Sequence, residues 1–144
     1  MAALQLAKIF FIAGTVPFIV LGLVHWLYTF MDMSRPRKLT PRDDAVRIAM
    51  EGTTPRLTPH TTMWKAWLGF NHSHSLGAVF FGLIYLILAL QDFTALAANT
   101  VLMILAAAVP LIYLWIGFRF WFRIPITGIA MSAVCMMIAV ALTL

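Results

Sequence analysis

The sequence predicts an all-α polytopic membrane protein, a four-transmembrane-helix bundle with a cytoplasmic interfacial helix in the first loop. Two observations support this fold class. Of the 144 residues, 62% are hydrophobic and only 10% are charged, and a soluble domain of this size cannot bury so much apolar surface. The apolar residues also fall into four long stretches rather than being spread evenly. We therefore expect a single transmembrane domain that covers residues 1–144.

The four predicted spans cover residues 6–31, 67–90, 98–117 and 124–143. Each has the roughly 20 residues needed to cross about 30 Å of hydrocarbon. The alternating pattern of a membrane barrel is absent, so the spans are predicted to be helices. Short connections at 91–97 and 118–123 predict that the last three helices are antiparallel neighbours. Pro110 is expected to kink the third span.

Basic residues predict the orientation of these spans. The first and third loops contain Arg35, Arg37, Lys38, Arg42, Arg47, Arg56, Lys65, Arg119 and Arg123. The other side of the membrane has only Lys8. The positive-inside rule therefore places both loops in the cytoplasm and both termini outside, in what we expect to be a bacterial inner membrane. The net charge of +5 then indicates contact with anionic lipid rather than with nucleic acid.

The first loop, residues 32–66, is predicted to contain a short interfacial helix. Thr40 is the expected N-cap, Pro41 the first helical residue, and Asp43 a favourable acidic residue in the first turn. The helix is expected to end near Glu51. A second helix-start signal follows at Thr58–His60. The face toward lipid or the bundle would be formed by Ala45, Ile48 and Ala49.

A helix advances about 100° per residue, and this period predicts which faces meet inside the bundle. Membrane helices pack through small residues and hydrogen bonds. The inner face of the second span is expected to be formed by Trp67, Asn71, His74, Ser75, Ala78, Gly82, Tyr85 and Ala89. Its bulkier face is formed by His72, Leu76, Phe80, Leu83 and Ile87. Matching inner stripes are formed by Gly14, Phe18, Leu21, His25, Tyr28 and Asp32, by Asn99, Met103, Ala106, Pro110, Tyr113 and Gly117, and by Gly128, Ser132, Cys135 and Ala139.

The segment FNHSHSLG, residues 70–77, concentrates polar groups in an apolar chain. His74 in this segment and His25 in the first span are predicted at similar depth, in the cytoplasmic third of the bundle. An ionisable group inside a membrane is by default a functional candidate. The predicted polar cluster consists of His25, Tyr28, Asn71, His74 and Ser75, with Asp32 nearby. His72 is two residues from His74 and therefore points to another side of the helix.

Several functions are compatible with this cluster. The two histidines can simply hydrogen-bond neighbouring side chains and fix helix register. The chain can be an accessory subunit of a membrane complex, or a binder of lipid or another hydrophobic ligand. The alternative is a small membrane enzyme that acts on a lipid or amphipathic substrate through a His-containing pocket open to the cytoplasmic side.

No cofactor or metal is predicted, although haem b held axially by His25 and His74 is a minority alternative. The Glu-x-x-His pattern of bundle iron sites is absent. Cys135 is the single cysteine, which excludes an intrachain disulfide and a Cys-x-x-Cys redox pair. The expected partners are membrane lipids and other protein chains, in a homo-oligomer or a larger membrane complex.

Two resemblances follow from these motifs. The segments WLGFNHSHSLGAVFFGLIYL and FRFWFRIPITGIAMSAVC resemble the hallmark regions of an uncharacterised family of small four-helix bacterial membrane proteins, which implies the fold but no activity. In length, topology and long first loop, the chain is also similar to the membrane-associated family of eicosanoid and glutathione metabolism. Lys65 and Asn71 match part of that family's second-helix motif. Its glutamate is missing, because Leu76 and Gly77 follow Ser75, and no catalytic residue is implied.

Overall fold

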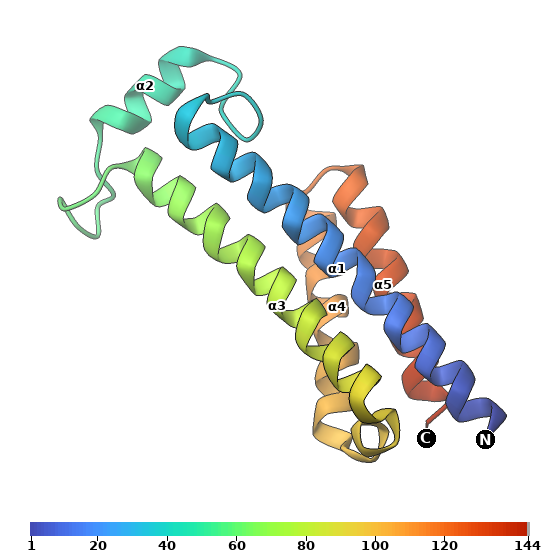
Figure 1. Cartoon of the computed structure of the whole chain (residues 1–144). Coiled ribbons are helices and arrows are strands. Elements are labelled where there is room, and N and C mark those ends of the chain that lie inside the picture. Colours follow the sequence, from blue (N-terminus) through green and yellow to red (C-terminus); the bar gives the residue numbers. More distant parts are fainter. Residues whose placement is uncertain (144) are drawn as a thin grey trace. The chain divides into compact units, whose positions relative to one another are not determined.

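The computed structural model describes residues 1–143, which form five helices and no strand (Figure 1). The helices are α1 (Ala2–Ser34), α2 (Asp44–Gly52), α3 (Met63–Ala98), α4 (Thr100–Phe120) and α5 (Arg123–Ala141). Four of them, α1, α3, α4 and α5, are long and apolar enough to cross a membrane. The prediction of an all-helical chain with four long apolar helices and a short helix in the first loop is confirmed.

The chain divides into two compact units. The first, which we call the bundle unit, consists of Met1–Leu21 and Ala78–Leu144. It contains the first part of α1, the second part of α3, and α4 and α5. The second, the loop unit, is Gly22–Gly77. It contains the remaining parts of α1 and α3 and the whole of α2.

One apolar core joins all four helices of the bundle unit. It includes the fully buried Phe11 of α1, whose ring meets Tyr85 and Phe93 of α3 edge-on, at centroid distances of 5.8 and 5.5 Å. The small or flexible residues around these rings are Ala7, Ala89, Leu96, Met103, Ala106, Met136 and Ala139. Such edge-to-face aromatic pairs add about 0.5–1.5 kcal/mol beyond area burial.

Glycines let α1 approach its neighbours closely. A Cβ at Gly82 of α3 would lie 2.6 Å from Ile19 Cγ1 and 2.9 Å from the backbone oxygen of Thr15. A Cβ at Gly14 would likewise lie 2.9 Å from Met136 Cγ of α5. The buried hydroxyl of Ser132 in α5 donates to the Gly14 carbonyl across the same interface, at 2.6 Å. Small residues and an interhelical hydrogen bond thus form the packing surface, as membrane helices require.

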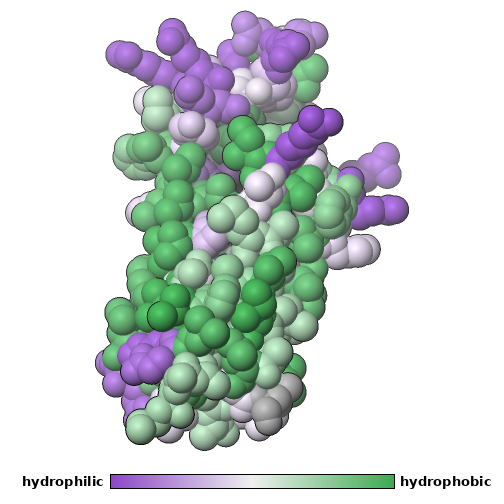
Figure 2. Space-filling model, turned by 90° about the vertical axis from the view of Figure 1, so that its right-hand side faces the viewer, coloured by the Kyte–Doolittle hydropathy of each residue, from purple (hydrophilic) through white to green (hydrophobic). Residues whose placement is uncertain are grey.

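Large apolar side chains cover the outside of the helices. Phe80, Leu83 and Ile87, from the predicted bulky face of α3, are all exposed. Figure 2 shows mainly apolar side chains on the visible face, with the hydrophilic ones gathered in separate groups. Contiguous exposed apolar surface of this extent favours contact with lipid or with other apolar chains.

The predicted loop at 91–97 is wrong, because α3 continues to Ala98 with a kink at Asp92. The backbone of Asp92 leaves the helical region (φ −153°, ψ 93°). Its carboxylate accepts from the Ala95 backbone N–H at 3.0 Å, as an N-cap does. Asn99, predicted in the inner stripe of the third span, instead caps α4 by accepting from Leu102 N–H. Because Asp92 and Asn99 each cap the start of a helical segment, the polar connection between the second and third spans is largely helical.

The predicted start of the interfacial helix at Thr40–Pro41 is also wrong. Helix α2 begins at Asp44, and Asp43 is its N-cap, with Oδ1 accepting from Ala45 N–H. Thr40 is held at the end of α1 instead, where its hydroxyl donates to Asp32 Oδ2 at 3.1 Å and the preceding Leu39 N–H donates to the same oxygen. The signal at Thr58–His60 forms only a turn, in which the Thr58 hydroxyl accepts from His60 N–H.

The third connection is shorter than the predicted 118–123, because α4 extends to Phe120 and α5 starts at Arg123. Helix α4 runs through the buried Pro110. Proline lacks the N–H that would bond the Ala106 carbonyl.

Candidate functional site

The loop unit pairs the C-terminal part of α1 with the N-terminal part of α3, which run side by side in opposite directions (Figure 1). His25 of α1 and Asn71 of α3 face one another across this pair. His25 Nε2 lies 2.8 Å from Asn71 Oδ1. Asn71 is buried and His25 is half-buried. This side chain–side chain hydrogen bond is the centre of the candidate site.

The backbone of α3 fixes the orientation of the Asn71 amide. Asn71 Nδ2 donates to the Trp67 carbonyl oxygen at 2.8 Å, so Oδ1 faces His25 as an acceptor. His25 must therefore carry its proton on Nε2 to complete the bond. In the neutral ring the lone pair is then on Nδ1. The arrangement selects one tautomer of His25 and gives it a defined acceptor.

His74 lies beside this bonded pair and is also half-buried. Its ring meets that of His25 nearly perpendicularly, with centroids 5.5 Å apart. The exposed ring of Phe70 also stacks almost parallel to the His74 ring, with centroids 6.1 Å apart. Phe70, which sequence analysis did not include in the site, follows from helical spacing because it precedes His74 by four residues.

Two buried hydroxyls lie beside the pair, and neither bonds the His25 ring or the Asn71 amide. Ser75 donates to the Asn71 carbonyl at 2.7 Å, and Thr29 donates to the His25 carbonyl at 2.9 Å. Each hydroxyl therefore bonds the backbone of its own helix, one turn earlier. Ser75 belongs to the predicted cluster by position, whereas Thr29 was not predicted to take part. Both bonds satisfy hydroxyls that are buried beside the two central side chains.

Tyr28 and Asp32 are not brought to the pair. The Lys38 ammonium lies over the Tyr28 ring, 5.2 Å from its centroid. The buried Asp32 carboxylate bonds the chain that follows α1. His72 also lies outside the pair, with Nε2 3.3 Å from Met33 Sδ. The predicted cluster thus reduces to His25, Asn71 and His74, with Ser75 behind them.

Haem ligation through His25 Nε2 would require breaking its bond to Asn71. Among residues 1–143, no three His, Cys, Asp or Glu side chains are grouped as metal ligands. What the arrangement offers chemically is a half-buried imidazole pair that can exchange protons or hydrogen bonds with a hydroxyl, phosphate or amine.

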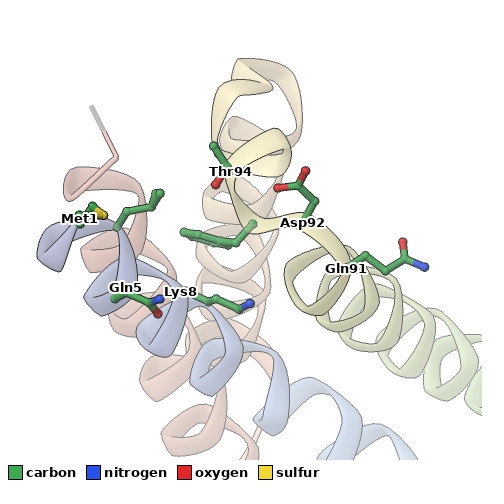
Figure 3. Close-up of a pocket in the computed structure, with 8 residues that line it drawn as sticks. Met1, Gln5, Lys8, Gln91, Asp92 and Thr94 are labelled. Carbon is green, nitrogen blue, oxygen red and sulfur yellow. The ribbon is translucent and has the colours of Figure 1, made fainter.

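The structure also contains cavities away from this cluster. One, of about 340 Å³ in the bundle unit, lies between the start of α1 and the kink of α3 (Figure 3). In Figure 3 the Lys8 side chain extends from α1 toward the α3 segment that carries Gln91. Gln5, Asp92 and Thr94 add further polar groups to the lining. The other, in the loop unit, follows α1 directly, and three of its seven lining residues are basic.

Comparisons with protein-family models, with curated proteins and with solved structures find no match for this chain. The resemblance to a family of small four-helix bacterial membrane proteins therefore stays a prediction. The site must be interpreted from its own chemistry.

Proposed function

We propose that this chain is a small integral membrane protein of a bacterial inner membrane that binds a lipid or another amphipathic ligand at His25, Asn71 and His74. In this proposal both termini are outside and the first and third loops are cytoplasmic. The observation that carries it is the hydrogen bond between His25 Nε2 and Asn71 Oδ1, at 2.8 Å. It orients an imidazole that is half-buried between two helix segments.

The surroundings of the pair favour an amphipathic ligand. Trp26, Trp67 and Phe70 are exposed on the same helix segments, and aromatic side chains of this kind suit the boundary between acyl chains and headgroups. With its Nε2–H bonded to Asn71, the His25 imidazole offers its Nδ1 as an acceptor to a polar headgroup. A ligand with an apolar body and a hydrogen-bonding head would satisfy both kinds of surface.

The test compares retained ligands by native mass spectrometry, after gentle extraction of the full chain from bacterial membranes. The change H25F removes both ring nitrogens at similar volume, and N71L removes the amide. His72→Phe is the matched control, because His72 lies in the same segment but outside the pair. We expect the wild-type chain and H72F to retain the ligand, and H25F and N71L to bind it at least about tenfold more weakly, equivalent to ~1.4 kcal/mol.

Equal ligand occupancy in all four proteins, with lower thermal stability in H25F and N71L alone, would show that the pair only fixes helix packing. A Soret band in the absorbance spectrum of the extracted protein would show haem instead. A changed membrane lipid composition on expression of wild type but not H25F would favour the enzyme, since histidine can act as a general base.

A further inference from the structure

A buried carboxylate shapes the chain that follows α1. Asp32 is only 1% exposed. Its Oδ1 accepts from the backbone N–H groups of Arg37 and Lys38, at 2.8 and 2.9 Å. Its Oδ2 accepts from Leu39 N–H at 2.6 Å and from the Thr40 hydroxyl at 3.1 Å. Four donors on one carboxylate fold residues 37–40 back onto the end of α1.

This folded segment surrounds a cavity of about 370 Å³. Three basic residues line it, Arg37, Lys38 and Arg42, together with the acidic Asp44. Asp44 Oδ1 is 3.8 Å from Arg47 Nε, which offsets part of its charge. Both ion pairs found in residues 1–143 belong to Arg47, so no carboxylate within this part of the chain pairs with the three lining cations.

The Lys38 ammonium is held by the ring of Tyr28, 5.2 Å from the ring centroid. A cation over an aromatic face is attracted by the ring quadrupole and loses part of its freedom. Tyr28 therefore orders one of the three cations of the cavity.

Apolar side chains lie directly after the cavity. Helix α2 has no buried residue, and Val46 and Ile48 are 47% and 59% exposed. The cavity itself follows α1, one of the four helices long enough to cross a membrane. A concave group of cations between a membrane span and an exposed apolar helix suits a molecule whose phosphate and acyl chains are covalently joined.

We propose that the cavity at residues 36–44 binds the phosphate of an anionic phospholipid. Arg37 and Arg42 bind the phosphate oxygens, and Lys38 supplies a third positive charge. Ile48 contacts the acyl chains, on the exposed face of α2 that it shares with Ala45 and Ala49. Asp32 is a positioning residue, because its four hydrogen bonds hold the basic segment in its concave form. This site is separate from the His25–Asn71 pair and does not depend on it.

The test measures binding of phosphatidylglycerol to the full chain in a neutral detergent, by native mass spectrometry, with phosphatidylcholine as the reference lipid. We expect R37Q and R42Q each to weaken phosphatidylglycerol binding about fivefold. The control R56Q removes one charge from the same loop outside the cavity, and should change binding less than about twofold.

Asp32→Asn gives the sharpest contrast because it removes a negative charge. If the basic residues act only through diffuse attraction, D32N tightens binding to the anionic lipid. If Asp32 shapes the cavity, D32N weakens binding at least about fivefold, since the new NH₂ group cannot accept from backbone N–H groups. Tighter binding by D32N, or equal losses in R42Q and R56Q, overturns the proposal.

Two further arms remain decisive if D32N does not fold. Tyr28→Leu keeps the charge but removes the ring beneath Lys38, and should weaken binding about threefold, whereas Y28F retains it. Unchanged binding by Y28L overturns the cavity assignment. Glycerol 1-phosphate, offered without lipid, tests the source of the phosphate. If it binds as tightly as phosphatidylglycerol with the same variant dependence, the ligand is a soluble phosphate and not a lipid.

Discussion

Within residues 1–143, the buried polar side chains are hydrogen-bonded, although most of the chain is apolar. Among them, every buried side-chain nitrogen or oxygen has a hydrogen-bond partner. Most of these bonds are local, such as Thr15 to the Ile12 carbonyl. Ser132 is different, because its hydroxyl crosses from α5 to the Gly14 carbonyl of α1. In lipid an unsatisfied polar group costs several kcal/mol. The effect of a polar side chain on stability therefore depends on which partner it bonds.

Ser132→Ala should therefore destabilise the protein modestly, by about 0.6 kcal/mol and at most ~1.7 kcal/mol, the range for interhelical hydrogen bonds in membranes. The measurement is unfolding in mixed micelles with increasing denaturing detergent. Ser73→Ala is the matched control, because Ser73 is exposed and bonds only its own helix at Phe70. An equal loss in S73A would show that the Ser132 bond adds nothing specific.

The sequence predicted which side chains lie together only where the helical period alone determines their positions. His25, Asn71 and His74 could be placed together because their positions on two helices follow from spacing. Tyr28 could not be excluded in this way, since it shares the stripe of His25 but is drawn to Lys38 in a loop of unknown path. The role of Asp32 was not foreseen for the same reason, because four donors from an irregular segment leave no periodic signal.

The close approach of two helices depends on glycine. Gly82 and Gly77 both lie in α3, but their surroundings differ. A Cβ at Gly82 would meet the Thr15 backbone oxygen at 2.9 Å, whereas nothing lies within 4 Å of one at Gly77. A backbone atom cannot rotate away as a flexible side chain can, so α1 and α3 must separate in the Gly82 variant.

Gly82→Ala should accordingly destabilise the bundle unit by about 1–3 kcal/mol, the usual range for overpacking. Gly77→Ala should be neutral or stabilise α3 by up to about 1 kcal/mol, because alanine favours the helix over glycine. Thermal unfolding followed by circular dichroism in detergent separates the two. If G82A is as stable as G77A, the close contact between α1 and α3 is not required.

Helix ends were predicted less well than helix faces, for a physical reason. The segment QDFTALA is polar enough to be taken for a loop, but Asp92 caps the six residues that follow it. In the first loop Thr40 and Asp43 both have the chemistry of an N-cap. Asp32, eight residues before Thr40, binds the Thr40 hydroxyl and the backbone N–H groups of residues 37–39, which holds Thr40 at the end of α1 and leaves Asp43 as the cap of α2. A local pattern cannot include those contacts.

For the whole molecule, composition predicted four long apolar helices, and the structure contains them. The orientation remains a proposal that depends on nine basic residues in two loops against Lys8 on the other side. It also implies that the kink at Asp92 and the cavity near Lys8 face the outside, whereas the basic cavity at residues 36–44 faces the cytoplasm. Chemical labelling of one engineered cysteine at a time can decide this.

In a C135A background, which removes the single native cysteine, Thr94→Cys and Arg56→Cys place a thiol in exposed positions. Thr94 lies in the connection predicted outside, and Arg56 in the first loop. A membrane-impermeant maleimide should label T94C in intact bacterial cells, and R56C only after permeabilisation. If the positive-inside rule applies, labelling in intact cells should be at least about tenfold stronger for T94C than for R56C.

Because R56C itself removes one basic residue, Thr58→Cys serves as a charge-neutral control in the same loop. Labelling of T58C but not T94C in intact cells would reverse the orientation. It would also place the anionic-lipid cavity at the outer leaflet, where the cytoplasmic surface potential could no longer assist binding.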